Sequence, residues 1–471
     1  MTALSLDRST LDMRRGVCPA LSTPMMTGDG LLARISLVEA ISPVELANIC
    51  RLALMHGNGM IDISARGNLQ IRGLSETSAP RLDADVRAMN LALRDGLAVE
   101  VPPLAGMDES EIVDPRPIAE AIRKGAREIT GLAPKMAVVI DGAGQLRLSD
   151  LLADIRLVAV SKTEWKLLLG GTEQSGRVIN VLRETHAVDT VLALLRRLAA
   201  LGNKARGRDL SFGPTLDKEA TAFSTSSSGF SRGSAGVAPV DPLRMLGTSP
   251  SMTAQDAATA PSSPFNFYPL ADSLHAIGIG PAFGQSRAKD LIALCDEASR
   301  LGIRSLKPAL DHALLFFGPK NACEALQDFA CENGFITSAS DPRGHIAACT
   351  GSPACNSATV ATHDIAAEAA AECGDLLDGS FKLHVTGCAK GCAHPEPTAL
   401  ALCGTAAGVS LIAQGKASGE PFAFTDFADT NATLRRLSDL VRIERRPGEN
   451  SADCLARIGS ARLAAAATGR P

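Results

Sequence analysis

The order of predicted secondary-structure elements repeats in the two halves of this 471-residue chain. In each half an extended apolar segment leads into a helix with amphipathic spacing, and a second extended segment follows. These segments are residues 31–38, 43–57 and 61–74 in the first half, and residues 273–280, 286–302 and 303–318 in the second. A repeat of this length limits the fold to a doubled scaffold whose two copies share one order of elements.

The repeat continues beyond these segments. After Asp114 the chain reads PRPIAEAIRKGAREI, a predicted helix, and then KMAVVIDG, a predicted strand. After Cys355 a predicted helix is again followed by a strand, FKLHVTGC. The opening strand–helix–strand order is typical of a ferredoxin-like unit, and the later elements suit an α/β domain. We therefore predict an α+β fold of two ferredoxin-like half-domains and two α/β domains, related by pseudo-twofold symmetry.

A stretch rich in Ser, Gly, Pro, Ala and Thr separates the two halves and shows no hydrophobic period, so it is predicted to be a flexible linker. The predicted divisions are a first half-domain at 1–85, a first α/β domain without cysteines at 86–223, the linker at 224–264, a second half-domain at 265–335 and a cysteine-bearing α/β domain at 336–471. Because one chain supplies both copies, we expect a monomer.

Composition narrows the class of protein. A net charge of −4 with one Trp and one Tyr disfavours a nucleic-acid surface, because such surfaces need excess cations and stacking rings. No apolar run is long enough to cross a membrane, and the start of the chain lacks the apolar core of a secretory signal. We expect a cytoplasmic protein whose twelve cysteines are reduced thiols or metal ligands. No nucleotide-binding glycine motif occurs, and the GDG at 28–30 is predicted to be a turn, so NAD(P)H is not expected to bind this chain and would act only through a separate electron donor.

Four cysteines suggest the chemistry. Cys349 and Cys355 are spaced C-x5-C, and Cys388 and Cys392 are spaced C-x3-C, both within loops of small residues. Two such loops can supply four thiolates to an iron–sulfur cluster. Structural zinc is the main competitor, but its loops are usually C-x2-4-C at both ends, which the first pair does not match. Buried thiols without any metal are the third alternative, and packing is the better explanation for the other cysteines, among them Cys295.

The segment Thr386-Gly387-Cys388-x3-Cys392, with Cys349-x5-Cys355 upstream, resembles the nitrite/sulfite reductase superfamily. Within it, the opening RRGVCPALSTPMMTGDGLLARI and the loop GCAKGCAHPEP resemble the precorrin-3B synthase family. The chain departs from the reductases where they have a second lysine, since Ala137 follows Lys135 in Lys-x-Ala. The loss of half of this cationic cage argues against sulfite as the substrate and makes bound sirohaem doubtful.

This resemblance implies an O2-dependent hydroxylation of precorrin-3A at the meso carbon between rings A and D, with closure of a γ-lactone, in aerobic cobalamin biosynthesis. It also implies a [4Fe-4S] cluster on the four cysteines and a mononuclear non-haem iron. Two alternatives stay open: a sirohaem-dependent sulfite or nitrite reductase, and a non-catalytic metal-binding or tetrapyrrole-carrier protein.

The resemblance further indicates residues for the carboxylates of the substrate. Arg66 and Gln70 match the Arg-x3-Gln strand of the family, and Lys135 occupies the remaining lysine position. Arg34 and Arg116 are additional candidates, and Arg72 is a further possibility beside them, because guanidinium groups pair well with carboxylates. For any single arginine, a solvated surface charge is the alternative.

Overall fold

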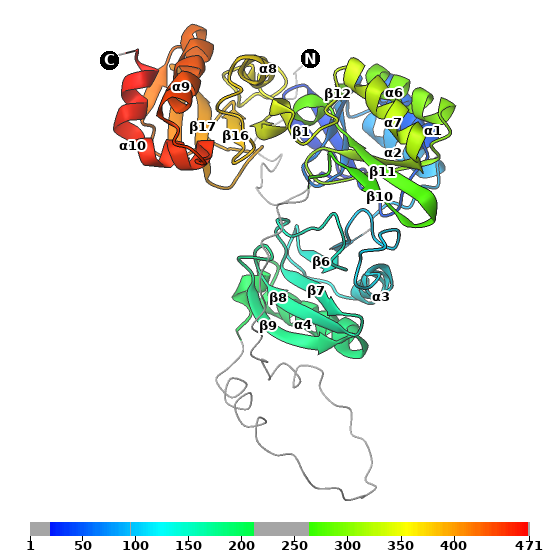
Figure 1. Ribbon diagram of the computed structural model, residues 1–471. Helices are drawn as coiled ribbons and strands as arrows, with labels where there is room; N and C mark the ends of the chain where they lie inside the picture. Colours follow the sequence, from blue (N-terminus) through cyan, green and yellow to red (C-terminus); the bar gives the residue numbers. More distant parts are fainter. Residues whose placement is uncertain (1–18, 95, 212–262, 470–471) are drawn as a thin grey trace, which may run out of the picture. The chain divides into compact units, whose positions relative to one another are not determined.

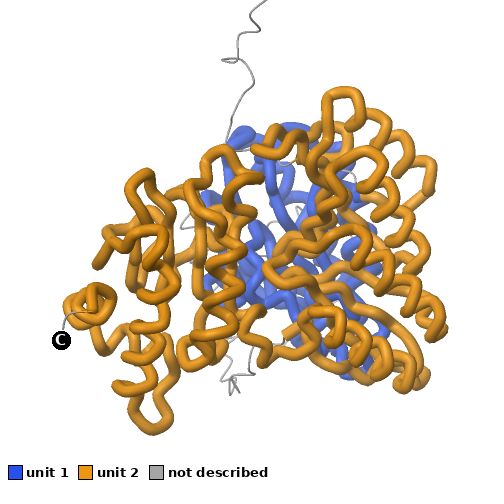
Figure 2. Tube along the Cα trace, turned by 90° about the horizontal axis from the view of Figure 1, so that it is seen from above, with its two compact units in different colours: residues 1–18, 94–262 blue, residues 19–93, 263–471 orange. Residues whose placement is uncertain are grey.

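The computed structural model describes residues 19–94, 96–211 and 263–469 (Figure 1). These residues fall into two compact units, coloured separately in Figure 2. The smaller unit contains residues 94–211, and the larger unit contains residues 19–93 and 263–469. The predicted linker at 224–264 lies, apart from its last two residues, outside the described residues. Within the described residues, no helix combines the length and the apolar character needed to span a bilayer.

The larger unit begins with a ferredoxin-like half-domain. Its elements are β1 (Met25–Thr27), β2 (Gly30–Ile35), α1 (Pro43–His56), β3 (Met60–Ile63), β4 (Leu69–Leu74) and α2 (Ala79–Ala88). Ser42 begins α1 with a capping box, because its hydroxyl accepts from the Glu45 amide while the Glu45 carboxylate accepts from the Ser42 amide. The strand predicted at 61–74 is a hairpin, since the turn around Gly67 (φ +68°) separates β3 from β4.

The second half-domain follows the same plan. Its elements are β10 (Phe267–Pro269), β11 (Leu274–Ile279), β12 (Gln285–Arg287), α6 (Ala288–Arg300), β13 (Ser305–Pro308), β14 (Leu314–Pro319) and α7 (Lys320–Glu332). The segment predicted as one strand at 303–318 is likewise a hairpin, β13 with β14. Sequence periodicity missed both turns because the flanking residues are apolar or β-branched on each side.

The two half-domains share one core. Strand β12 of the second half pairs with β3 of the first, giving the sheet order β1-β2-β4-β3-β12, and Leu306 of β13 bridges reciprocally to Ile41. One cluster of buried residues contains apolar side chains from both halves, including Leu46 and Ile49 of α1 and Leu291 and Leu294 of α6. The half-domains therefore stabilise each other through a common interior.

The larger unit ends with an α/β domain. It contains β15 (Ile346–Ala348), α8 (Thr362–Glu372), β16 (Leu383–Thr386), β17 (Thr398–Thr405), β18 (Gly408–Gly415), β19 (Ala423–Thr425), α9 (Thr430–Glu444) and α10 (Ser451–Ala467). The strands lie in the order β15-β16-β17-β18-β19; the first three are parallel and the last two antiparallel. Helices α9 and α10 lie side by side in Figure 1 and contribute Leu434, Leu437 and Leu455 to the core of this domain.

The smaller unit repeats that topology. It contains β5 (Ala98–Glu100), α3 (Arg116–Ala126), β6 (Ala137–Asp141), β7 (Ile155–Ser161), β8 (Glu164–Leu169), β9 (Arg177–Arg183) and α4 (Glu184–Leu201). Its sheet order is β5-β6-β7-β8-β9, with β5, β6 and β7 parallel and the other pairings antiparallel. Trp165 of β8, the single tryptophan of the chain, is fully buried in its core. Because two domains far apart in the sequence share five strands in one order, the predicted duplication is present in the fold.

Candidate functional site

The two cysteine loops leave neighbouring parallel strands at the same edge of the sheet. Cys349 directly follows β15, and Cys388 follows β16 by one residue, Gly387. These strands pair in register from Ile346 with Leu383, and the Cys349 amide extends the ladder by donating to the carbonyl of Val385 at 3.1 Å. Since the carboxyl ends of parallel strands meet at one edge, both loops emerge together.

Each loop is closed by tight backbone turns. In the first, the Cys355 amide donates to the carbonyl of Gly351 at 2.8 Å, and Gly351 has a φ of +67° that favours glycine. In the second, the Gly391 amide donates to the carbonyl of Cys388 at 3.3 Å, and Gly391 has a φ of +59°. These glycines allow each loop to turn so that both of its cysteines face one region.

The loops are also tied to each other. Lys390 Nζ, in the second loop, donates to the hydroxyl of Ser357 at 2.8 Å, just beyond the first loop. The amide of Thr359 donates to the carbonyl of Gly387 at 3.0 Å. The ammonium group of Lys390 therefore bridges the two loops, and its positive charge lies close enough to Cys392 to act on that thiol.

Four free thiols gather at this edge. Cys349, Cys355 and Cys388 are half-buried and Cys392 is exposed. Burial raises the pKa of the Cys392 thiol, and the neighbouring thiolates of Cys388, Cys349 and Cys355 raise that pKa further. Like-charge repulsion of this kind requires the four sulfur atoms to be close. The Gly387 amide lies 3.2 Å from Cys349 Sγ, the type of N–H···S contact that stabilises a negatively charged cluster.

The number and spacing of the thiols are the features that favour a cluster. Four thiols at one sheet edge match the ligand number of a cubane, whose irons each take one cysteine, and the C-x5-C spacing is unlike that of structural zinc loops. We therefore keep the four thiols as the predicted ligands of a [4Fe-4S] cluster. Among residues 19–94, 96–211 and 263–469, no group of three or more His, Cys, Asp or Glu side chains is arranged to hold a metal ion, so the predicted mononuclear iron has no assigned ligand set.

One histidine near the second loop was not singled out by its sequence context. His384 on β16 is fully buried, and neither of its ring nitrogens has a hydrogen-bond partner among the described residues. Its ring packs edge-on against that of His394, with 5.8 Å between centroids. Burial, followed by the nearby His394, lowers the pKa of His384 to about 4, so His384 is neutral at neutral pH. No sequence motif marks it, because its burial follows from its place on a central strand.

The candidate substrate residues of the larger unit lie in the first half-domain. Arg34 of β2 and Gln70 of β4 are paired in the sheet register, and the guanidinium of Arg34 lies 2.9 and 3.2 Å from the Gln70 amide, whose oxygen accepts both bonds. Arg66 was expected on a strand, but it lies in the turn between β3 and β4, where its side chain is exposed. Within the described residues the Arg66 guanidinium has no hydrogen-bond or ion-pair partner, which leaves it free to bind an anion.

The other two candidates lie in the smaller unit and at opposite edges of its sheet. Lys135 was expected on a strand, but it precedes β6 at the amino end, in an exposed turn with a φ of +64°. Arg116 begins α3 beside the loop that follows β5, and its guanidinium donates to both carboxylate oxygens of Asp114 at 2.9 and 2.8 Å. Arg116 therefore already has an anionic partner, and the smaller unit does not bring these two cations together.

Arg72 is not available to a substrate. Its side chain is 4% exposed and is paired with Asp29 and Asp62. Asp29 belongs to the GDG turn, which holds its carboxylate against Arg72. No local pattern marks this pairing, because Asp29 and Asp62 lie 43 and 10 residues before Arg72 in the chain.

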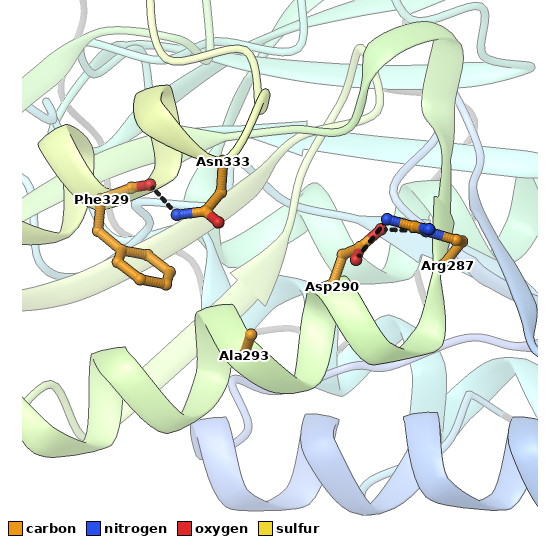
Figure 3. Close-up of a pocket in the computed structure, with 5 residues that line it drawn as sticks. All are labelled: Arg287, Asp290, Ala293, Phe329 and Asn333. Atoms are coloured by element: carbon orange, nitrogen blue, oxygen red, sulfur yellow. Dashed lines mark hydrogen bonds and ion pairs between the residues drawn. The ribbon is translucent and has the colours of Figure 1, made fainter.

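A surface pocket lies between α6 and α7, and none of the four cysteines of the two loops lines it (Figure 3). Its polar groups are already satisfied: Arg287 pairs with Asp290, and Asn333 Nδ2 donates to the carbonyl of Phe329 at 2.8 Å. Its remaining lining residue is Ala293. None of these groups is a nucleophile, a thiol or an unpaired charge, so we place the chemistry at the cysteine loops.

Comparison with known proteins now identifies the family. Residues 24–89 match the family described as nitrite/sulfite reductase ferredoxin-like half domain. A precorrin-3B synthase from Sinorhizobium sp. is 38% identical over 465 residues, covering 96% of this chain and 95% of the relative. This chain belongs to the precorrin-3B synthase family. The match spans both copies of the duplicated scaffold, so the precorrin-3B synthase family shares the whole architecture and not one domain of it.

The fold of this precorrin-3B synthase family member is also that of a solved structure, the NirA protein of Mycobacterium tuberculosis. The TM-score is 0.66 over 92% of this chain and 84% of that chain, at 16% sequence identity. At that identity the likeness shows the fold alone. Together with the half-domain match, it confirms the predicted α+β, nitrite/sulfite reductase-like architecture.

Proposed function

We propose that this chain is a precorrin-3B synthase, an oxidoreductase that uses O2 to hydroxylate precorrin-3A at the meso carbon between rings A and D. An acetate side chain then closes to a γ-lactone. One oxygen atom of O2 enters the product and the other leaves as water, with the required electron pair coming from a separate reduced donor. The observation that carries the proposal is the near full-length match to a relative of that name.

The cysteine loops support the cofactor part of the proposal. Cys349, Cys355, Cys388 and Cys392 would hold the [4Fe-4S] cluster, since their thiols converge at one sheet edge and the Gly387 amide already donates to one of them. When bound, the cluster supplies single electrons, and a mononuclear iron is the group that the family resemblance assigns to O2. The protein's own contribution is to position the macrocycle and to keep water from the reacting carbon.

Cations of the chain would bind the carboxylates of the macrocycle. Arg66 supports this role because it is exposed and without a partner among the described residues. Arg34 supports it because Gln70 holds its guanidinium in one orientation, which lowers the entropy lost when it binds an anion. Lys135 and Arg116 are proposed as contributors from the smaller unit; Arg116 would have to exchange Asp114 for a substrate carboxylate.

The reaction is tested with isotopically labelled O2. Protein purified without oxygen is mixed with precorrin-3A and a reductant. One reaction is run under isotopically labelled O2 and a parallel reaction under argon, and the mass of the product is measured in both. We expect a gain of one labelled oxygen atom in the first reaction and none in the second. Oxygen incorporation under argon, or a strong sirohaem absorption spectrum with sulfite reduction, would contradict the proposal.

The ligand assignment has a separate test. Cys388→Ser should remove iron, acid-labile sulfide and turnover together, because a serine oxygen is a poor cluster ligand. Cys295→Ser is the matched control, since Cys295 is a buried packing thiol in the half-domain core. Retention of full iron and sulfide in Cys388→Ser would show that the assignment is wrong.

A further inference from the structure

Arg72, on the central strand β4, uses every nitrogen of its guanidinium. Nε and Nη2 donate to the two carboxylate oxygens of Asp29 at 2.9 and 2.8 Å, and Nη1 donates to Asp62 at 2.9 Å. Nη1 also donates to the hydroxyl of Thr350, and Nη2 to the carbonyl of Ala354, both at 3.3 Å. A lysine could not reproduce this pattern, because it has no planar fork of donors.

The last two of these bonds reach the first cysteine loop at both of its ends. Thr350 directly follows Cys349, and Ala354 directly precedes Cys355. One guanidinium therefore fixes the residue next to each cysteine of the C-x5-C pair. The loop lies 278 and 282 residues away from Arg72 in the sequence.

The first half-domain approaches the loop closely at this point. A Cβ atom on Gly28 would stand 2.6 Å from the backbone nitrogen of Asn356 and 2.7 Å from the carbonyl oxygen of Ala354. The backbone of the GDG turn is thus packed directly on the cysteine loop, and only glycine permits the approach.

The second half-domain joins the same network. Asp62 of β3 accepts from Arg72 on one carboxylate oxygen and from Gln285 Nε2 of β12 on the other, at 2.9 and 2.7 Å. Because β12 comes from the second half, the orientation of Arg72 depends on the pairing of the two half-domains.

We propose that Arg72 is the positioning residue that fixes the Cys349–Cys355 loop for cluster binding and sets the electrostatic potential at the cluster, so that cluster retention depends on the first half-domain. The inference rests on the proposed [4Fe-4S] cluster and deepens it, by naming a regulator of the cluster that lies outside the cysteine loops.

The charge of Arg72 matters as well as its hydrogen bonds. A cation near a cluster favours the reduced state, which carries one more negative charge. Asp29 and Asp62, only 16% and 14% exposed, offset part of that charge. Burial tends to raise the pKa of Asp29, but the bonds from Arg72 and Thr27 outweigh it and hold the pKa below its usual value, so Asp29 is ionised at neutral pH. Loss of the guanidinium would leave this carboxylate uncompensated beside the loop.

Three variants separate these effects. Arg72→Gln removes both the charge and the fork, Arg72→Lys keeps the charge alone, and Thr350→Val removes one of the two bonds from Arg72 to the loop. Arg287→Gln is the matched control, since it also breaks an Arg–Asp pair, but an exposed one between the last residue of β12 and the first turn of α6. Iron and acid-labile sulfide are measured on full-length protein purified without oxygen, together with the rate of cluster loss to a chelator, the cluster reduction potential and the thermal midpoint.

We expect cluster loss to be about tenfold faster or more in Arg72→Gln and Arg72→Lys, as for other groups that hold metal ligands in place. The reduction potential should become more negative in Arg72→Gln and stay close to wild type in Arg72→Lys. Thr350→Val should lose its cluster several-fold faster than wild type, with an unchanged thermal midpoint. This variant therefore tests the positioning role even if the Arg72 variants unfold. Arg287→Gln should match wild type in every readout.

Wild-type loss rates in both Thr350→Val and Arg72→Lys would overturn the positioning role. An unchanged potential in folded Arg72→Gln would overturn the electrostatic role. If wild-type protein with Arg72 intact contained no acid-labile sulfide, the proposed cofactor itself would be refuted and this inference with it. If only the inference fails, the wild-type protein still contains the cluster and the variants lose it at the wild-type rate.

Discussion

A half-buried carboxyl group in the smaller unit gives a quantitative prediction. Glu111 lies in the loop after β5, where the Gly106 amide donates to its carboxylate at 2.8 Å. Burial, followed by the nearby carboxylates of Asp114, Asp108 and Asp141, raises the pKa of Glu111 from 4.5 to about 7. The amide bond from Gly106 opposes this rise without cancelling it. We predict that Glu111→Gln stabilises the smaller unit at and above neutral pH.

The sign and size follow from proton linkage. Between pH 4.5 and about 7 the folded chain keeps a proton on Glu111 that the unfolded chain has lost, so the free energy of unfolding falls as pH rises through this window. At about 1.4 kcal/mol per pKa unit, the full penalty above this window would be roughly 3 kcal/mol. Water screens part of it at this half-buried site, so we expect roughly 1–2 kcal/mol. The amide of glutamine can still accept from Gly106 and carries no charge, so the variant avoids the penalty.

The single tryptophan makes the assay specific. Trp165 is fully buried in the smaller unit, so its fluorescence reports the unfolding of that unit within the full-length protein. Urea unfolding followed by this signal, at several pH values from about 5 to about 8, should show the gap between Glu111→Gln and wild type widening as pH rises. Glu109→Gln is the control, since Glu109 is an exposed carboxylate two residues away on the same loop.

A gap that stays constant with pH, or that narrows toward high pH, would refute the assignment of a protonated Glu111 in the folded state. An equal effect of Glu109→Gln would show that net charge, and not burial, is responsible.

Three further predictions concern packing and ion pairing. Asp154→Asn should destabilise the smaller unit by roughly 3 kcal/mol in the Trp fluorescence assay. The side chain of Asp154 is 4% exposed, and Arg206 binds its carboxylate through two nitrogens, so the substitution leaves Arg206 without that partner. Gly28→Ala should lower the iron and sulfide content by pushing the cysteine loop outward, whereas Gly344→Ala, where an added Cβ would meet no atom within 4 Å, should not. Phe316→Ala should cost about 3–5 kcal/mol of half-domain stability in calorimetry, since Phe316 is fully buried in the shared core; a cost below about 1 kcal/mol would show that the core closes over the cavity.

Much of the architecture could be predicted because helices and strands follow from the periodic spacing of apolar residues along the chain. The amphipathic helices at 43–57 and 286–302 appear as α1 and α6, and the strands KMAVVIDG and FKLHVTGC appear as β6 and β16. Strand periodicity could not separate β3 from β4 or β13 from β14, because a short turn with apolar flanks leaves little trace in the pattern. The sequence could not predict that β12 of the second half-domain pairs with β3 of the first, because strand pairing depends on contacts between residues far apart in the chain.

The candidate site also has features that the sequence predicted and features that it did not. Cysteine spacing placed two thiols in each loop, and the loops do leave adjacent strand ends, although their role as cluster ligands stays a prediction. Arg34 and Gln70 lie together as a strand pair, whereas Arg66 and Lys135 lie in turns and not on strands. Arg72 looked like its neighbours in sequence, and only its burial against Asp29 and Asp62 removed it from the substrate candidates.

The sequence by itself determined that the scaffold is doubled and that the later copy carries four thiols in two loops, because periodicity and spacing are properties of neighbouring residues. Only the tertiary structure decided which charges are paired. Arg72 meets Asp29 over 43 residues and Thr350 over 278, and the pKa of Glu111 is raised because folding buries it among other carboxylates. Burial and electrostatic coupling depend on distance in space, and a chain fixes those distances only after it has folded.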